Sequence, residues 1–242
     1  MKQYNNEKAI ISLTSWKGRI NQVGKVIYSI FKQCPGFHIV LVLSKAEFPL
    51  QEKELPQDLL VLLNHNIFEL LWVEENYKSL KKVLYTMDKY REVPVISADD
   101  DCLYTCNYAE ILYNAWHKTH SNVVTLQPAK AWKHTCQQYG ECTLHAPYCY
   151  GPHGLIALNR CANEFLIEDG NDDHFLSALR EVLHIYGYNI LKIRNTSIHT
   201  WYNNKSTIGV YGRCAENGLS AYDRCEAIIR KELLRYFKET SV

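Results

Sequence analysis

Residues 93–101 have the sequence Val-Pro-Val-Ile-Ser-Ala-Asp-Asp-Asp, a short apolar run that ends in three consecutive carboxylates. An apolar run of this length is typical of a strand buried in the middle of a sheet. Two carboxylates about 4 Å apart repel each other by roughly 4 kcal/mol at an effective dielectric near 20. A block of such groups at the end of a buried strand therefore indicates that a cation binds there.

The three carboxylates are expected to divide between the two faces of this strand. Side chains alternate along a strand, so Asp99 and Asp101 should point the same way and Asp100 the opposite way. Open α/β sheets place their ligands at the carboxyl ends of their strands. Two carboxylates on one face suit a hard ion such as Mg²⁺ or Mn²⁺. The sequence therefore predicts a metal site made by Asp99 and Asp101, with Asp100 outside it.

The rest of the chain alternates between strand and helix patterns, which is typical of an α/β fold with a mostly parallel sheet flanked by helices. Strands are expected at residues 9–14, 37–43, 68–73, 93–98, 122–127, 151–158 and 189–193. Helices are expected at residues 21–33, 55–63, 79–89, 108–119, about 172–186 and from about 219 onward. Residues 129–150 lack a period and are expected to form an elaborated loop. No linker or internal repeat interrupts the pattern, so one domain is expected.

Composition restricts the function further. The chain has 27 basic and 26 acidic residues among 242, and no nucleic-acid-binding signature, so no nucleic-acid partner is expected. Its nine cysteines include no CxxC pair, and no stretch approaches the roughly 18 apolar residues of a membrane span. The N-terminus is polar and unlike a signal peptide. We expect a reduced, cytoplasmic protein.

Three segments resemble the nucleotide-sugar glycosyltransferases of the GT-A fold. Ile-Ser-Leu-Thr-Ser-Trp-Lys-Gly-Arg (11–19) is similar to the opening strand and loop of that family. Ser-Leu-Lys-Lys-Val-Leu (79–84) and Ile-Ser-Ala-Asp-Asp-Asp-Cys-Leu-Tyr (96–104) are similar to its DxD motif and the preceding helix. The resemblance covers roughly residues 9–200 and is closest to bacterial transferases that build capsule or lipopolysaccharide sugars. It implies a nucleotide-sugar-binding half (about 9–128), an acceptor and catalytic half (about 129–218) and a C-terminal helix (about 219–242).

The resemblance also implies roles for acidic residues and one histidine. DxD carboxylates of the family hold a divalent ion that bridges the donor diphosphate, which implies Mn²⁺ or Mg²⁺ on Asp101, with Asp99 at the ribose or the metal. Some members complete the metal shell with a late histidine, here His199. Inverting members take their catalytic base from an acidic pair, usually its second residue, here Asp173. Asp172 before it has the simpler interpretation of a helix cap.

Further residues are implied to contact the donor. Thr14 and Arg19 follow the first strand, where the family meets the nucleotide base, and Lys82 could reach the nucleotide or its phosphates. Gly154 lies in a segment that resembles the glycine-containing turn facing the donor sugar. Each has an alternative that stays open, because a lysine pair on a helix is usually a solvated face and the glycine suits an ordinary turn.

The implied activity is the transfer of a sugar, with a UDP-sugar favoured as donor, to a glycan or lipid-linked acceptor in bacterial surface polysaccharide synthesis. The basic C-terminal helix either lies on the inner face of the membrane, near such an acceptor, or packs against the domain. Two other functions stay open, a nucleotidyltransferase of related fold and a non-catalytic sugar-nucleotide-binding protein. A dehalogenase-like phosphatase is disfavoured, because its motif comes early and has Thr or Val where this chain has Leu103.

The loop at residues 134–149 has two interpretations of its own. Its histidines and cysteines are ligands that zinc favours, although their spacing fits no common zinc pattern. Structural, reduced cysteines are the alternative. The residues concerned are His134, Cys136, Cys142, His145 and Cys149.

Overall fold

The computed structural model of the chain describes residues 8–127, 142–168, 172–185, 187, 189–194, 199–201, 227–236 and 238–239. Its strands are β1 (Ile10–Thr14), β2 (His38–Ser44), β3 (Phe68–Val73), β4 (Val95–Ser97), β5 (Cys102–Tyr104), β6 (Val123–Gln127), β7 (Thr143–His145), β8 (Ile190–Arg194) and β9 (His199–Trp201). Its helices are α1 (Ile20–Gln33), α2 (Gln57–Leu62), α3 (Lys81–Lys89), α4 (Tyr108–Thr119), α5 (Gly151–Glu168) and α6 (Asp172–His184), and residues 227–236 are also helical.

Seven of these strands form one mixed sheet in the order β3-β2-β1-β4-β7-β6-β8, and β5 pairs with β9 in a small second sheet. The pairs β1–β2, β2–β3, β1–β4 and β6–β8 are parallel, whereas β7 runs antiparallel to both β4 and β6. The expected α/β fold with a mostly parallel sheet flanked by helices is confirmed.

The order of the strands reverses between β1 and β4. From β1 the chain builds outward through β2 to β3, and it then returns to place β4 on the other side of β1. Because β1 and β4 are parallel, with Ile10 opposite Val95 and Ser12 opposite Ser97, their carboxyl ends meet at the same edge. Such a reversal point is where open α/β sheets bind ligands.

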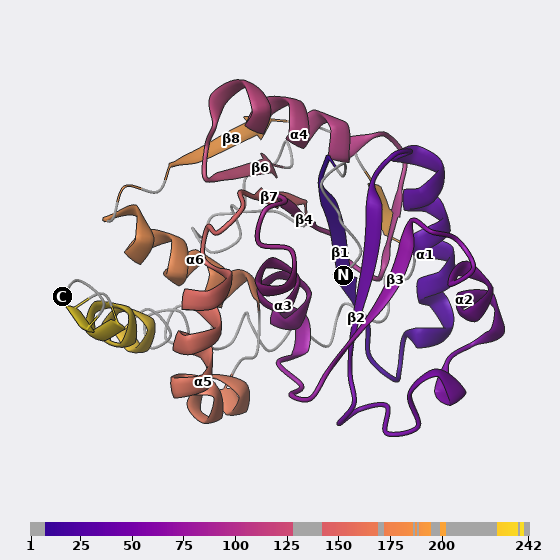
Figure 1. Cartoon of the computed structure of the whole chain (residues 1–242), viewed down its shortest axis with the longest axis horizontal. Helices are drawn as coiled ribbons and strands as arrows, with labels where there is room; N and C mark the ends of the chain where they lie inside the picture. The colour runs from indigo at the N-terminus through magenta and orange to yellow at the C-terminus, as the bar shows by residue number, and fades with distance from the viewer. Residues whose placement is uncertain are drawn as a thin grey trace.

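Helices cover both faces of the sheet. The apolar stripe of α1, the residues of α2 and part of α4 pack on one face, whereas α3, α5, α6 and the helix at residues 227–236 contribute to a second core on the other. In Figure 1, α1 and α2 lie beside β1, β2 and β3 at the right, and α5, α6 and the C-terminal helix lie beyond α3 at the left. The strands β1 and β2 at the centre are buried along their whole length because both faces are covered.

Two expectations are wrong. Residues 143–145, expected within the loop at residues 129–150, form β7 in the middle of the sheet. Residues 151–158, expected as a strand, form the first turns of α5. The buried positions there are 151, 154, 157 and 158, which is helical spacing, but two of them are glycines and carry no apolar signal. A Cβ on Gly151 would lie 2.6 Å from the Met87 side chain, so the glycine lets α5 approach α3 closely.

The segment after residue 219 is described from residue 227 onward. Ile229 and Leu233 of its helix are buried in the core on the side of α3. This confirms that Ile229 and Leu233 of the helix pack against the domain. Among the residues that the structure describes, no helix is long and apolar enough to cross a membrane.

Candidate functional site

The candidate site lies at the reversal point of the sheet, where two loops leave adjacent parallel strands. The loop after β1 carries Ser15 and Arg19, and the turn after β4 carries the three aspartates. β4 ends at Ser97, whose hydroxyl accepts a hydrogen bond from the Thr143 backbone N–H of β7 at 3.2 Å. Beyond it the chain turns, so the aspartates do not alternate between two faces of a strand.

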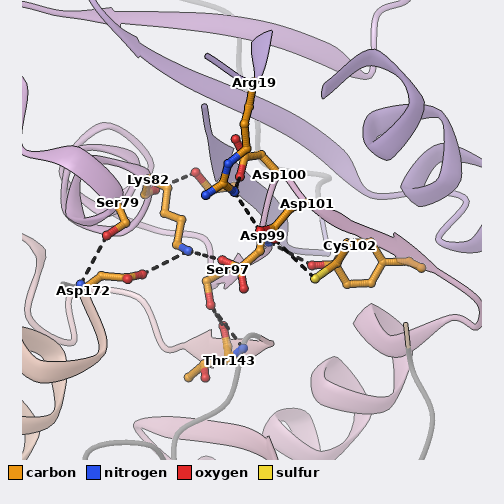
Figure 2. A network of polar contacts seen from close by, with 12 residues as sticks. Arg19, Ser79, Lys82, Ser97, Asp99, Asp100, Asp101, Cys102, Thr143 and Asp172 are labelled. Carbon is orange, nitrogen blue, oxygen red and sulfur yellow. Dashed lines mark hydrogen bonds and ion pairs between the residues drawn. The ribbon is translucent and has the colours of Figure 1, made fainter. Parts of the chain in front are cut away.

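Asp100 and Asp101 both bind the guanidinium group of Arg19. One nitrogen, Arg19 Nη1, donates to Asp100 Oδ1 at 2.6 Å and to Asp101 Oδ2 at 2.8 Å (Figure 2). Ser15 Oγ donates to the other oxygen of Asp100 at 2.6 Å. The expectation that Asp100 points away from Asp101 is therefore wrong, because the strand ends before the alternation reaches them. The assignment of Asp99 and Asp101 as metal ligands stays a prediction.

Asp99 has a different cation as its partner. Lys82 Nζ of α3 lies 2.5 Å from Asp99 Oδ1 and 3.0 Å from Asp172 Oδ2, at the first residue of α6 (Figure 2). The backbone N–H of Asp172 donates to Ser79 Oγ at 3.2 Å. Burial disfavours the ammonium of Lys82, but the two carboxylates outweigh burial and raise its pKa well above the usual value. Burial likewise opposes ionisation of Asp172, yet the attraction of Lys82 lowers its pKa.

Lys81, next to Lys82, is buried but less well paired. Its Nζ lies 3.2 Å from Asn76 Oδ1 and 4.0 Å from the Glu47 carboxylate. Burial lowers its pKa to about 8, against the attraction of Glu47 and Asp100. Burial also raises the pKa of Asp100, and Arg19 and Ser15 offset that rise only in part.

Taken together, the described side chains of the site carry an excess of negative charge. The carboxylates are Asp99, Asp100, Asp101, Asp172 and Glu47, and the basic groups are Arg19, Lys81 and Lys82. Five carboxylates against three basic groups give these described side chains a formal charge of −2, which a divalent cation would balance.

No protein-family model and no curated protein sequence matches this chain. Its structure is similar to solved structures of other proteins. A mannosyltransferase from Pyrobaculum calidifontis, in complex with GDP-Man and Mn²⁺, has a TM-score of 0.59 and 13% identity over 93% of this chain and 68% of that chain. A putative glucose-1-phosphate thymidylyltransferase from Bacillus anthracis has a TM-score of 0.53 and 11% identity, covering 92% and 94% of the two chains. The synthetase of CMP-2-keto-3-deoxy-manno-octonic acid, complexed with CTP, has a TM-score of 0.50 and 10% identity, covering 87% and 98%.

The chain has the α/β fold that GT-A glycosyltransferases share with nucleotidyltransferases. This GT-A-like fold is what the similarity shows, since every identity is far below 25%.

The aspartate turn of this GT-A-like fold has the donor chemistry that a divalent metal requires. Carboxylate oxygens are the preferred ligands of Mg²⁺ and Mn²⁺, and those of Asp100 and Asp101 already converge on one positively charged atom. Among the described residues, no three His, Cys, Asp or Glu side chains are grouped as a metal cage. A bound ion would therefore complete its shell with water or with the phosphates of a ligand, as Mg²⁺ commonly does.

Four other residues predicted to belong to the site are Thr14, Gly154, Asp173 and His199, and they lie on different elements. Thr14 Oγ1 donates to the Val42 carbonyl at 2.7 Å, so only its lone pairs remain for a ligand. Gly154 lies inside α5, so the expected turn is wrong, and its contact with a donor sugar stays a prediction. Asp173 is the second residue of α6, and His199 lies opposite Tyr104 in the β5–β9 pair. The side chains of Asp173 and His199 lie outside the described part, and their roles stay predictions.

The histidine and cysteines near β7 that are described have ordinary surroundings. Cys142 and Cys149 are buried, and the His145 ring is hydrogen-bonded to the Tyr150 hydroxyl. Burial raises the pKa of the Cys149 thiol well above its usual value, which disfavours the thiolate that zinc needs. His134 and Cys136 lie outside the described residues.

Sequence reasoning missed Ser15 and the pairing role of Asp172. Ser15 and Asp100 are 85 residues apart, and only the parallel pairing of β1 with β4 brings them together. Asp172 was expected only as a helix cap, whereas its carboxylate binds Lys82. A sequence signal existed for the second case, since a lysine buried on a helix requires a carboxylate partner.

Proposed function

We propose that this protein is a metal-dependent glycosyltransferase that uses a nucleotide-sugar donor. The observation that carries the proposal is the pair of carboxylates, Asp100 and Asp101, whose oxygens converge on one cation at the reversal point of the sheet. The similarity to a mannosyltransferase whose structure contains GDP-Man and Mn²⁺ supports it, as does the excess of two negative charges around the turn.

The chain's own residues would divide the work of transfer. Asp100 and Asp101 would hold Mn²⁺ or Mg²⁺, with Asp99 beside them, and His199 remains a candidate for a further ligand. When bound, the ion would stabilise the negative charge that develops on the departing nucleotide phosphates. Asp173 would deprotonate the acceptor hydroxyl, which then attacks the anomeric carbon with inversion. Lys82 would fix the start of α6, next to Asp173, through its ion pair with Asp172.

The donor and acceptor follow from the resemblance alone. We propose a UDP-sugar as donor and a glycan or a lipid-linked saccharide as acceptor, in the synthesis of a bacterial surface polysaccharide. Thr14 and Lys82 are proposed to lie beside the nucleotide.

A nucleotidyltransferase is the second candidate, because solved structures of such enzymes are similar to this chain as well. The structural match with this chain covers more than nine tenths of the thymidylyltransferase and of the CTP-bound synthetase. Such an enzyme also needs a cation at the carboxyl end of a central strand. The two functions differ in the bond that breaks, because glycosyl transfer releases the nucleotide of the donor and nucleotidyl transfer releases pyrophosphate.

The experiment is a thermal-shift screen of UDP-, GDP-, CMP- and dTDP-sugars, and of CTP and dTTP, each with and without Mn²⁺. A ligand that binds only the folded state raises the melting temperature by mass action. We expect one nucleotide-sugar series to do so, and only with the metal. Asp101→Asn should abolish that shift, whereas Lys17→Gln, which removes an exposed ion pair with Glu54, should keep it. Stabilisation by a nucleoside triphosphate alone, with pyrophosphate release, would replace the proposal by the second candidate.

A further inference from the structure

Asp100 and Asp101 are each held by a small neighbour on the side away from Arg19. Ser15 Oγ donates to Asp100 Oδ2 at 2.6 Å, while Oδ1 of the same group faces the guanidinium. The Cys102 thiol donates to Asp101 Oδ1 at 3.7 Å, while Oδ2 faces the guanidinium. Outer hydrogen bonds of this kind orient the carboxylates of metal sites. Asp100 Oδ1 and Asp101 Oδ2 are thus both held toward the position of Arg19 Nη1.

Arg19 occupies this position with incomplete hydrogen bonding. Both carboxylates bind the same nitrogen, Nη1, at 2.6 and 2.8 Å, rather than the two parallel bonds that a guanidinium forms at its best sites. Its Nε is buried and has no hydrogen-bond partner among the described residues. An unsatisfied buried donor costs about 1–3 kcal/mol, so the occupancy of the site by Arg19 is not optimal.

Asp99 is bound differently. Its partner Lys82 also pairs with Asp172, so it is shared between two elements and almost fully buried. An ion that displaced Lys82 from Asp99 would also take Lys82 away from Asp172 on α6. Both carboxylates that Arg19 gives up would instead bind the ion, and Arg19 comes from the turn just before α1 and is more exposed. An incoming ion therefore meets less resistance at Asp100 and Asp101 than at Asp99.

We propose that Asp100 and Asp101 are the principal metal ligands, that Arg19 is the internal cation of this pair in the metal-free protein, and that a divalent ion displaces it. The inference rests on the proposed metal-dependent function and goes beyond it in assigning the ligand pair and its competitor. The displaced guanidinium is left beside the ion, where it binds the phosphates of the nucleotide. Metal and nucleotide then bind cooperatively, and the cooperativity is reciprocal.

The test measures Mn²⁺ binding without nucleotide, from the electron paramagnetic resonance signal of the free ion. Arg19→Gln removes the competing charge beside the site, so we expect it to tighten Mn²⁺ binding by about tenfold or more. Asp100→Asn and Asp101→Asn should weaken binding by a similar factor, and Asp99→Asn by much less. Lys17→Gln, in an exposed ion pair of the same loop, is the matched control for a general change in charge.

The outcomes separate the alternatives. Unchanged or weaker Mn²⁺ binding in Arg19→Gln would overturn the competition, and so would an equal gain in Lys17→Gln. A larger loss in Asp99→Asn than in Asp100→Asn would return the site to Asp99 and Asp101. If Arg19→Gln does not fold, Arg19→Met replaces it, because methionine keeps an unbranched side chain without the charge. Tighter Mn²⁺ binding in Arg19→Met supports the competition, and binding equal to wild type or weaker contradicts it.

A second measurement repeats the titration with saturating UDP or GDP. We expect the nucleotide to strengthen Mn²⁺ binding in the wild type by about fivefold or more, and by less in Arg19→Gln. Equal strengthening in both proteins would contradict the proposed move of Arg19 to the phosphates. If neither nucleotide binds while Arg19→Gln still tightens Mn²⁺ binding, the proposed function fails and the competition at Asp100 and Asp101 stands.

Discussion

The ammonium of Lys82 lies 3.0 Å from the Asp172 carboxylate and connects the first turn of α3 to the first residue of α6. The same ammonium binds Asp99 at 2.5 Å, so one buried cation joins the aspartate turn to the helix that carries Asp173. Lys82 was expected to face the nucleotide. Its pairing gives it a structural task first, because both of its carboxylates would otherwise be unpaired.

Lys82→Met should therefore destabilise the protein. Removing one partner of a buried ion pair costs about 3 kcal/mol, since it leaves charge uncompensated. Asp99 and Asp172 retain side-chain exposures of 23% and 17%, which places the expected loss near the lower end of the usual range. Urea unfolding at pH 7 measures it. A loss below about 1 kcal/mol would show that solvent already screens both carboxylates.

The neighbouring Lys81 should behave in the opposite way. Its pKa is lowered to about 8 by burial, so the folded protein loses this proton before the unfolded chain does. Between pH 8 and about 10.5 the unfolded state holds more protons, and the stability of the wild type should rise with pH by about 3 kcal/mol from this group. Lys81→Met should lack that rise and be at least as stable as the wild type at pH 7. Urea unfolding from pH 7 to pH 10 tests this, and parallel curves for the two proteins would contradict it.

Much of the fold follows from local patterns. The helix expected at residues 108–119 matches α4 to the residue, and the apolar run before the aspartates forms β4 in the middle of the sheet. These elements are encoded by apolar periodicity, which a short window of sequence contains. Burial of the run, and hence the unusual position of the charges after it, could be inferred the same way.

The arrangement of the site depended on information that no short window holds. β4 ends at Ser97 and its neighbour β7 has only three residues, and residue spacing reveals neither that end nor the pairing. The prediction from side-chain alternation failed for this reason. The residue that shares a cation with Asp101 is Asp100, whereas Asp99 had been expected to do so. Arg19 was expected near a nucleotide base and is found on the carboxylates, which requires knowing that β1 and β4 are adjacent.

Gly154 should respond to substitution as a packing residue. A Cβ at this position would lie 2.6 Å from Leu84 Cδ2 and 3.2 Å from Leu179 Cδ2, closer than side chains pack. Gly154→Ala should therefore cost about 1–3 kcal/mol of stability, as overpacking does. The cost should be smaller in a Leu84→Ala background, where the crowding methyl is gone, and unfolding of the four proteins of this cycle measures the coupling. If Gly154→Ala is as stable as the wild type but no longer binds the donor, that result would instead support a role for Gly154 beside the donor sugar.

The acidic pair that opens α6 allows a final prediction, in which two adjacent residues separate structure from catalysis. Asp172 is bound to Lys82, whereas Asp173 is the proposed base. Asp173→Asn should lower turnover by about 10²–10⁴-fold, the usual contribution of a general base, with metal-dependent nucleotide binding and melting temperature retained. Asp172→Asn should lower the melting temperature, because the pKa of Asp172 is held down by Lys82 and the ion pair is lost. Turnover, nucleotide binding and thermal unfolding of both variants test the division. Unchanged turnover in Asp173→Asn would exclude Asp173 as the catalytic base and would favour a mechanism that retains the anomeric configuration.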